Sequence, residues 1–170
     1  MNNLPHSADN SDYQSRITLE EELKKTRQQL QRIEEIAGIG HWEVDLLTGK
    51  IKWSEQFFRI LGLDPGISPT TELALSTMHP EDRGLAFETY QRSILDGTPF
   101  RLELKIIRPT SEVRSVISNG NVELNSEGKA IRLSGFFEDV TKEKRGFAEF
   151  RNSDPERENL LNSLRILSYC

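Results

Sequence analysis

The 170-residue sequence contains a single cysteine, Cys170, at its last position. One cysteine excludes a disulfide within the chain and a metal site built from several cysteines. Low cysteine use suits a reducing compartment, so we expect a cytoplasmic location. The three histidines, His6, His41 and His79, lie far apart in the sequence without metal-ligand spacing, and we predict no metal site.

Long apolar runs and an excess of basic charge are also absent. No run approaches the roughly twenty apolar residues that cross a bilayer, and the polar N-terminus lacks a signal-peptide pattern. We therefore predict no membrane contact. The 22 Lys and Arg are scattered among 27 Asp and Glu, which gives a net charge of −5 and predicts no nucleic-acid partner.

A catalytic arrangement is missing as well. Gly38 and Gly40 lie between a helix and a strand, the reverse of the order in a dinucleotide site. The adjacent acids Glu81 and Asp82 follow Pro80 at the start of a helix, where negative charge stabilises the helix dipole. We predict no catalytic residues and no enzyme activity for this chain.

The N-terminal part divides into two segments. Residues 1–17 are rich in Asn, Ser and Asp without a hydrophobic period, and they are predicted to be a disordered leader. Thr18 and Glu21 have the spacing of a capping box, which predicts that an amphipathic helix over residues 18–37 begins there. Gly38 is suited to end this helix.

Apolar residues in the 18–37 segment follow a heptad pattern, with Thr26 at a polar position within it. These residues, which we call the heptad stripe, are Leu19, Leu23, Leu30 and Ile33. The pattern predicts a coiled coil in a homodimer, with the stripe as the dimer contact. The alternative is that the stripe packs back on its own domain.

The spacing of apolar residues changes after Gly38 from a helical period to strand-like alternation. Alternating segments at 41–46 and 51–53, joined by a turn at 48–49, predict a β-hairpin. Ser54 can cap a short helix that Gly62 ends. Two further helices are predicted near 72–78 and 80–96, and His79, just before the second, is expected to hydrogen bond locally rather than bind haem.

Three strands are predicted to complete the domain, at 100–106, 113–124 and 130–140, with a turn at 125–128 before the last. Asn119–Gly120 is a strong hairpin dipeptide that falls inside the second of these strands. We favour a bulge at Gly120 in a continuous strand, and the alternative is a hairpin. Residues 142–170 are predicted to form C-terminal signalling helices, interrupted near Pro155. The apolar faces of these helices suggest that they are truncated parts of a longer helical structure.

This order of elements over residues 36–145 resembles the PAS family, in particular the type found in bacterial sensor histidine kinases. The motifs that carry the resemblance lie at residues 40–42, 48–49, 53–63, 79–83, 103–109 and 135–145. The resemblance implies an α+β fold for residues 38–141. Its five-stranded antiparallel sheet would have the order 2-1-5-4-3, with short helices on one face.

The resemblance also implies a function. It suggests a sensory and dimerisation module of a bacterial signalling protein, such as a histidine kinase of a two-component system or a diguanylate cyclase, with an effector domain as partner. The last strand would pass changes in the sheet to the next helix. Asp139 and Thr141 can both hydrogen bond backbone at that junction and are the predicted relay residues. The alternative is an interaction module that senses no ligand.

Members of this family can enclose a small ligand between sheet and helices. The aromatic residues predicted to line such a cavity here are Trp42, Phe58, Phe87, Tyr90 and Phe136. They suit a filled core equally well, so no cofactor is predicted and a small-molecule ligand is left open. The central helix lacks the cysteine of flavin-linking members, which excludes adduct photochemistry.

Two positions depart from the family pattern. Residues 108–112 read Arg-Pro-Thr-Ser-Glu, where the family usually has an Asp-Gly turn after Arg-Pro. Ser115 stands where Trp is common. The conformation of the 108–112 hairpin tip therefore does not follow from the resemblance.

Overall fold

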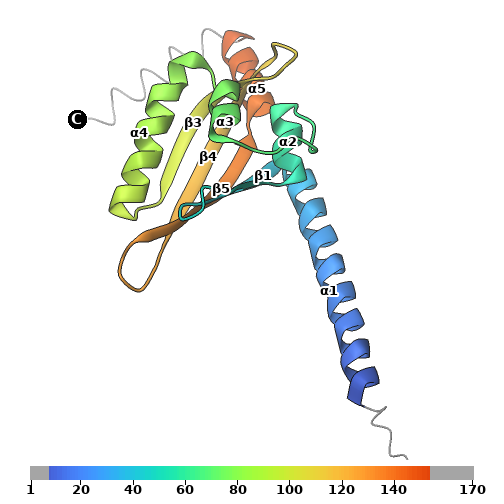
Figure 1. Cartoon of the computed structure of the whole chain (residues 1–170). Coiled ribbons are helices and arrows are strands. Elements are labelled where there is room, and N and C mark those ends of the chain that lie inside the picture. The colour runs from blue at the N-terminus through green and yellow to red at the C-terminus, as the bar shows by residue number, and fades with distance from the viewer. Residues whose placement is uncertain (1–7, 154–170) are drawn as a thin grey trace, which may run out of the picture.

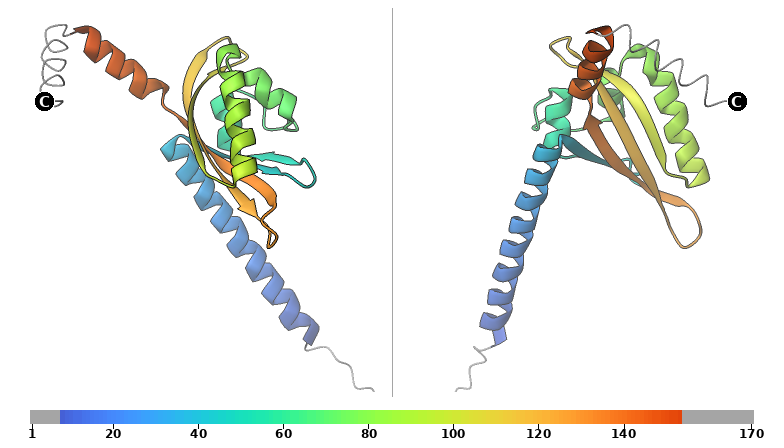
Figure 2. Two further views of the ribbon diagram at one scale, coloured as in Figure 1. Left: turned by 90° about the vertical axis from the view of Figure 1, so that its left-hand side faces the viewer. Right: turned by 180° about the vertical axis from the view of Figure 1, so that it is seen from behind.

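Five antiparallel strands form one curved sheet in the order β2-β1-β5-β4-β3, which confirms the predicted order. The computed structural model describes residues 8–153. Along the chain the elements are α1 (Ala8–Ala37), β1 (Ile39–Asp45), β2 (Ile51–Trp53), α2 (Glu55–Leu61), α3 (Thr71–Thr77), α4 (Pro80–Asp96), β3 (Phe100–Ile107), β4 (Val113–Leu124), β5 (Ala130–Asp139) and α5 (Thr141–Ser153). Helices α2, α3 and α4 lie over one face of the sheet, while α1 and α5 lead away from it (Figures 1 and 2).

Local side-chain bonds explain where the first strands and helices begin and end. The Asp45 carboxylate accepts the N–H groups of Leu47 and Thr48 at 2.9 and 2.8 Å, which closes the turn before β2. Ser54 Oγ accepts the Phe57 N–H at 3.2 Å and caps α2. Gly62 ends α2 in the left-handed conformation. The predicted hairpin and both predicted helix ends are confirmed.

The core lies between the sheet and its helices. Strand β3 alternates buried and exposed residues, with Leu102, Leu104 and Ile106 buried. Helices α2 and α4 bury Leu61 and Ala86 against this face. The alternation of apolar and polar residues along β3 therefore places its apolar side chains on the buried face of the sheet.

Strand β4 runs unbroken through Gly120, which pairs with Phe100 of β3 and Gly135 of β5. A Cβ atom on Gly135 would lie 1.8 Å from the Asn119 carbonyl oxygen, and one on Gly120 would lie 2.3 Å from the Phe100 ring. The glycines allow this close approach of backbone and ring. The irregularity in register lies at Glu123 and Leu124 instead, so the predicted bulge at Gly120 is wrong.

Helix α1 begins at Ala8, ten residues before its predicted start. The predicted disordered leader over residues 1–17 is therefore wrong for residues 8–17, where no Gly or Pro interrupts a helix. Thr18 is not a cap, because its hydroxyl donates to the Gln14 carbonyl oxygen at 3.0 Å inside the helix. Residues 1–7 and the predicted break near Pro155 lie outside the described part.

The heptad stripe of α1 does not pack on its own domain. Each of Leu19, Leu23, Leu30 and Ile33 is at least 51% exposed. Figure 1 shows that α1 points away from the sheet along most of its length. Among the described helices, none combines the length and apolar character needed to span a bilayer.

The C-terminus of α1 and the N-terminus of α5 lie at the same end of the sheet, because β1 and β5 are antiparallel neighbours. Ile39 at the start of β1 pairs with Glu138 near the end of β5. The Asp139 N–H donates to the Gly38 carbonyl oxygen at 3.3 Å. The residue that follows α1 and the last residue of β5, just before α5, are thus joined by a backbone hydrogen bond.

Candidate functional site

The first turn of α5 is fixed by side chains at its N-terminus. Asp139 Oδ1 accepts the backbone N–H of Thr141 at 3.0 Å and the Thr141 hydroxyl at 2.6 Å. Thr141 Oγ1 accepts the Ser115 N–H at 3.0 Å, and the Val140 N–H donates to the Ser115 carbonyl oxygen at 3.0 Å. The start of α5 is therefore bonded to β4 as well as to β5.

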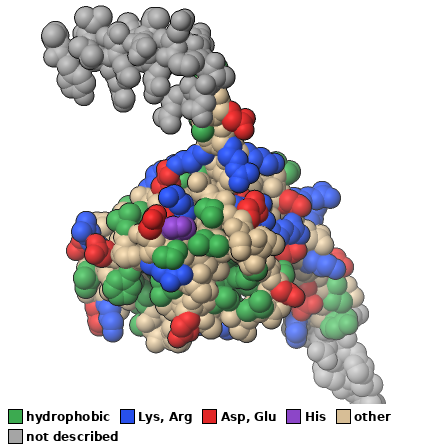
Figure 3. Space-filling model, turned by 90° about the horizontal axis from the view of Figure 1, so that it is seen from above, with side chains coloured by type: hydrophobic (Ala, Val, Ile, Leu, Met, Phe, Trp, Pro, Cys, Tyr) green, Lys and Arg blue, Asp and Glu red, His purple; other side chains and the backbone are tan. Residues whose placement is uncertain are grey.

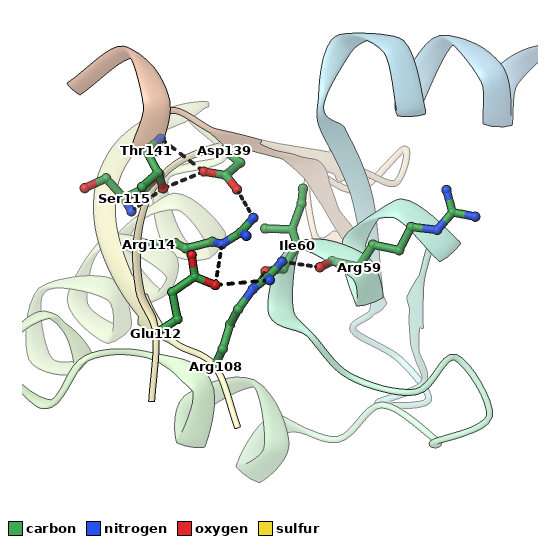
Figure 4. Close-up of polar contacts among 8 residues, drawn as sticks. All are labelled: Arg59, Ile60, Arg108, Glu112, Arg114, Ser115, Asp139 and Thr141. Atoms are coloured by element: carbon green, nitrogen blue, oxygen red, sulfur yellow. Dashed lines mark hydrogen bonds and ion pairs between the residues drawn. The ribbon is translucent and has the colours of Figure 1, made fainter. Parts of the chain in front are cut away.

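Arg114 continues these contacts toward the β3–β4 hairpin tip. Its NH1 group lies 2.5 Å from Asp139 Oδ2, and its Nε lies 3.3 Å from Glu112. Glu112 also forms an ion pair with Arg108, at 3.3 Å. We call Arg108, Glu112, Arg114, Asp139 and Thr141 the junction cluster (Figure 4).

Arg108 joins the junction cluster to the C-terminus of α2. Its Nε donates to the Ile60 carbonyl oxygen at 3.0 Å, and its NH2 donates to the Arg59 carbonyl oxygen at 2.5 Å. Carbonyl groups in the last turn of a helix have no partner within the helix, so a guanidinium is a suitable donor for them. A continuous series of polar contacts thus runs from α2 to α5 (Figure 4).

The charge state of Asp139 follows from these partners. Partial burial raises the pKa of the Asp139 carboxyl, but the hydrogen bonds from Thr141 and the Arg114 guanidinium outweigh burial, and the pKa lies below its usual value. Asp139 is therefore ionised at neutral pH. Its contacts with Arg114 and Thr141 are charge-assisted and stronger than bonds between neutral groups.

A cavity of about 240 Å³ lies between the sheet and helices α2, α3 and α4. We call it the inner cavity. Its buried wall includes Trp42, Leu133 and Phe137 from the sheet and Phe57 from α2. No Asp, Glu, Lys, Arg or His belongs to the lining that the structure describes.

The mouth of the inner cavity lies at the side chains of Thr71, Phe87 and Gln91, which are exposed. Two polar groups lie deeper. Burial raises the pKa of Tyr90, whose hydroxyl is 3.5 Å from Ser118 Oγ, so this phenol stays neutral. The Trp42 indole Nε1 is buried and has no hydrogen-bond partner within the described part of the chain.

Three of the five predicted cavity residues, Trp42, Phe87 and Tyr90, line the inner cavity. Phe58 is buried in α2 with its ring against Trp53, outside the lining. Phe136 is 52% exposed on the opposite face of the sheet, because adjacent residues of a strand point to opposite faces. The prediction that Phe58 and Phe136 line the cavity is therefore wrong.

The remaining candidates for a site are the charged and metal-ligating side chains of the described residues. The face seen in Figure 3 carries Lys and Arg side chains among Asp and Glu, without a broad region of one sign. Between residues 8 and 153, no three His, Cys, Asp or Glu side chains lie close enough to hold a metal ion. His79 caps α4, and its ring nitrogen accepts the Glu81 N–H at 3.4 Å.

Comparison with protein families assigns this architecture. Residues 50–137 match the family model described as the PAS fold, which covers just over half of the chain. The chain belongs to the PAS family. The sheet order and the helices on one face are therefore those of a PAS domain, as the sequence motifs suggested.

Relatives of this PAS domain occur in signalling enzymes. A blue-light-activated histidine kinase of Brucella anthropi is 34% identical over 134 residues, which are 79% of this chain and 27% of that protein. A probable diguanylate cyclase of Escherichia coli, DgcE, is 32% identical over 130 residues, 72% of this chain and 12% of that protein. The chain thus spans about a quarter or less of these relatives, and the activities in their names are theirs.

The same fold occurs in a solved structure. A sensory box histidine kinase/response regulator from Burkholderia thailandensis superposes with a TM-score of 0.61 at 26% identity, covering 76% of this chain and 98% of that chain. This PAS domain is thus of the kind found in histidine kinases and diguanylate cyclases.

The sequence predicted that Asp139 and Thr141 lie at the junction. It did not predict that Arg108, Glu112 and Arg114 contact them there. The alternation of charge along 108–114 is visible in the sequence, but it does not show what the charges face. The strand register decides that, because Val116 pairs with Asp139 and brings Arg114 within reach of its carboxylate.

Proposed function

We propose that this PAS domain is the sensory and dimerisation module of a bacterial signal-transduction protein. In this proposal it pairs with a second copy through α1 and relays changes in the sheet to α5. The observation that carries the proposal is the junction cluster, in which the ionised Asp139 at the end of the central strand holds the first turn of α5.

The relay would start at the inner cavity. Phe57 of α2 lines this cavity, and the last carbonyl groups of the same helix are bonded to Arg108. A shift of α2 would move Arg108, then Glu112 and Arg114, and would change the contact of Arg114 with Asp139. Because charge-assisted contacts weaken with distance, such a shift would bias the orientation of α5.

The proposed dimer would join the α1 helices of two copies. The exposed heptad stripe offers an apolar surface that one helix cannot bury alone. Thr26 occupies a polar position in this pattern, but its hydroxyl already donates to the Glu22 carbonyl oxygen at 2.9 Å. Its methyl group can therefore face a partner helix without leaving a donor unpaired.

Charge favours a parallel arrangement of the two helices. Glu22 and Arg27 are five residues apart on opposite flanks of the heptad stripe. In a parallel coiled coil this spacing brings Glu22 of one copy next to Arg27 of the other. Since both α5 helices begin beside the ends of α1, a parallel pair would place the two outputs on the same side of the dimer.

The effector would be a signalling domain or a partner protein, in keeping with the kinase and cyclase relatives. No catalytic role is assigned to the chain, and a cytoplasmic location is part of the proposal. The competing function is an interaction module that senses no ligand. Ligand-dependent thermal stabilisation separates the two, because only a module that binds a ligand gains stability from it by mass action.

A chimera with a histidine kinase catalytic core tests the relay. The chain is fused through α5, with the helix phase kept, in place of the kinase's own sensor domain. We expect Asp139→Asn and Thr141→Val to change basal autophosphorylation severalfold, because each removes a bond that orients α5.

The matched control is Glu123→Gln, which removes an exposed ion pair with Arg132 at the far end of β5. It should leave autophosphorylation unchanged. If Asp139→Asn gives the wild-type rate while circular dichroism shows an intact fold, the assigned relay is wrong.

A further inference from the structure

Helix α1 meets the rest of the domain without burying apolar side chains. Over residues 18–37 every residue is exposed except Glu34, which is half-buried and whose Oε1 lies 2.5 Å from His41 Nδ1 of β1. Ile36, close to the end of the helix, is 87% exposed. Helices in proteins are held mainly by packing of an apolar face. The direction of α1 relative to the domain therefore depends on polar contacts.

Four polar side chains join α1 to α2. Gln31 and Glu35 lie one turn apart on α1, and Glu55 and Arg59 lie one turn apart on α2. Gln31 Nε2 donates to Glu55 Oε2 at 3.4 Å, and Arg59 NH1 donates to Glu35 Oε1 at 3.1 Å. Arg59 NH2 also donates to Glu55 Oε1 at 2.7 Å. We call these four residues the α1–α2 contact.

Gly38 separates α1 from the tightly packed part of the chain. It has φ +66°, and a Cβ atom at this position would have no atom within 4 Å. At Gly40, by contrast, a Cβ atom would lie 2.4 Å from the backbone of Phe57 in α2. Strand β1 is thus packed on α2 from Gly40 onward, whereas Gly38 is open. A turn of α1 relative to the domain would therefore take place at Gly38.

Arg59 contacts the junction cluster as well as α1. Its guanidinium is bonded to Glu35 of α1, while its backbone carbonyl oxygen accepts the Arg108 NH2 group at 2.5 Å. Figure 4 shows the carbonyl oxygen of Arg59 toward Arg108 and the guanidinium pointing away from the junction cluster. A single residue of α2 therefore touches both the helix before the domain and the cluster that holds the helix after it.

We propose that Arg59 is a positioning residue that transmits a movement of α1 to α2, which makes α1 a second input to the relay besides the inner cavity. The inference rests on the proposed function, in which a shift of α2 reaches α5 through Arg108. A twist of the α1 pair about its own axis would pull on Glu35 and hence on Arg59. This route passes through neither the inner cavity nor the sheet.

A kinase chimera in which the phase of α1 is controlled tests this coupling. The chain is fused through α5 to the histidine kinase core as above, and a parallel dimeric leucine zipper is joined to Ala8. One version has the zipper in phase with the heptad stripe, and three others carry one, two or three extra residues before Ala8. Each extra residue turns α1 by about 100° relative to the zipper. The measurement is the difference in autophosphorylation among the four versions.

We expect the four versions with wild-type side chains to differ about two- to fivefold, which is the bias that exposed ion pairs can supply. Arg59→Gln removes the ion pairs with Glu35 and Glu55 but keeps the backbone bond to Arg108. It should make the four versions equally active. Glu35→Gln should act in the same direction, and the double variant should add little, because both changes remove one contact.

The matched control is Arg132→Gln. The Arg132 side chain is 44% exposed, against 49% for Arg59, and it also forms two ion pairs, with Glu43 at 3.7 Å and Glu123 at 3.0 Å. Neither partner belongs to α1 or to the junction cluster. The difference among the four versions should persist in this variant.

Any of three results would overturn the inference. The first is equal activity of the four versions with wild-type side chains. The second is a difference that persists in Arg59→Gln while circular dichroism shows an intact fold. The third is a loss of the difference in Arg132→Gln that is as complete as in Arg59→Gln.

The result is separable from that of the Asp139→Asn chimera, which reports the basal rate without a zipper. If Arg59→Gln removes the difference among the versions but Asp139→Asn behaves as wild type, the coupling of α1 to α2 stands and the relay through Asp139 fails. If Asp139→Asn changes the basal rate and Arg59→Gln keeps the difference, only the role of Arg59 is lost.

Discussion

At the scale of single residues, Ser111 and Arg114 lie at or next to the two places where this chain departs from the pattern of its family. Ser111 replaces the glycine of a common turn, and Arg114 sits one residue before the position where tryptophan is common. The first stores backbone strain, because Ser111 has φ +66°. The second supplies the charge that holds Asp139, at 2.5 Å.

Replacing Ser111 by glycine is expected to stabilise the domain. A side chain in the left-handed region costs about 1–2 kcal/mol, and the greater freedom of glycine in the unfolded chain takes back about half of that. We expect Ser111→Gly to raise the free energy of unfolding by about 0.5–1 kcal/mol in urea titrations. Ser111→Ala keeps the Cβ atom and should give no gain. Equal gains for both variants would contradict the role of backbone strain.

Asp139 gives a prediction about pH. Its pKa is lowered in the folded state, so its contribution to stability is present above the unfolded value of about 3.9 and is lost as the pH falls through the lower folded value. We expect Asp139→Asn to cost about 1–3 kcal/mol at pH 7. The difference from wild type should shrink when urea unfolding is measured at pH 3.

The control for this comparison is Glu123→Gln, which removes only an exposed ion pair. It should differ from wild type by less than about 0.5 kcal/mol at both pH values. An Asp139→Asn defect of the same size at pH 3 and pH 7 would show that the ionised carboxylate is not the source of the stability.

At the scale of elements, α1 differs from its expected form more than any other segment. The helix has 30 residues and begins ten positions before its predicted start. Its heptad stripe covers only the later part. Tyr13 is exposed, and so are the four stripe residues. The helix therefore has one apolar face that the rest of the domain leaves uncovered.

A charge swap on α1 is expected to report the orientation of the proposed pair. Glu22→Lys or Arg27→Glu would place like charges together across a parallel coiled coil, and each should weaken dimerisation severalfold. The double variant should recover most of the loss, as measured by analytical ultracentrifugation. Since residues five apart are not neighbours on one helix, recovery reports a contact between chains. Additive losses would argue against the parallel pair.

At the scale of the whole molecule, the sheet links the two helices that leave the domain. Figure 2 shows α1 and α5 leading away from the sheet in different directions, although their ends meet beside Gly38 and Asp139. The inner cavity lies on the face of the sheet that α2, α3 and α4 cover. In the proposed relay, a change in that layer would reach the helix junction through the sheet and through the junction cluster.

Self-association should make the stability of the whole chain depend on its concentration. If α1 pairs two copies, the melting temperature of wild type rises with protein concentration by mass action. Replacing both Leu23 and Leu30 by Asp should give a monomer by light scattering, with a melting temperature independent of concentration and a folded core. An unchanged mass for this double variant would refute the coiled coil.

The sequence by itself determined the elements and their order. Turn and cap residues such as Asp45, Ser54 and Gly62 act within a few positions of the chain, so their effects are local and readable. The alternation along β3 likewise fixes which of its residues are buried. The strand order followed from the resemblance of the motifs to a family, and the structure confirmed it.

Only the tertiary structure decided which side chains meet. Phe136 and Phe137 are equally suited to a cavity by type, and the register of β5 puts Phe137 inside and Phe136 outside. Arg114 and Asp139 are 25 positions apart and meet because β4 and β5 pair in one register. Contacts between distant segments depend on strand pairing and helix packing, which no local pattern of residues encodes.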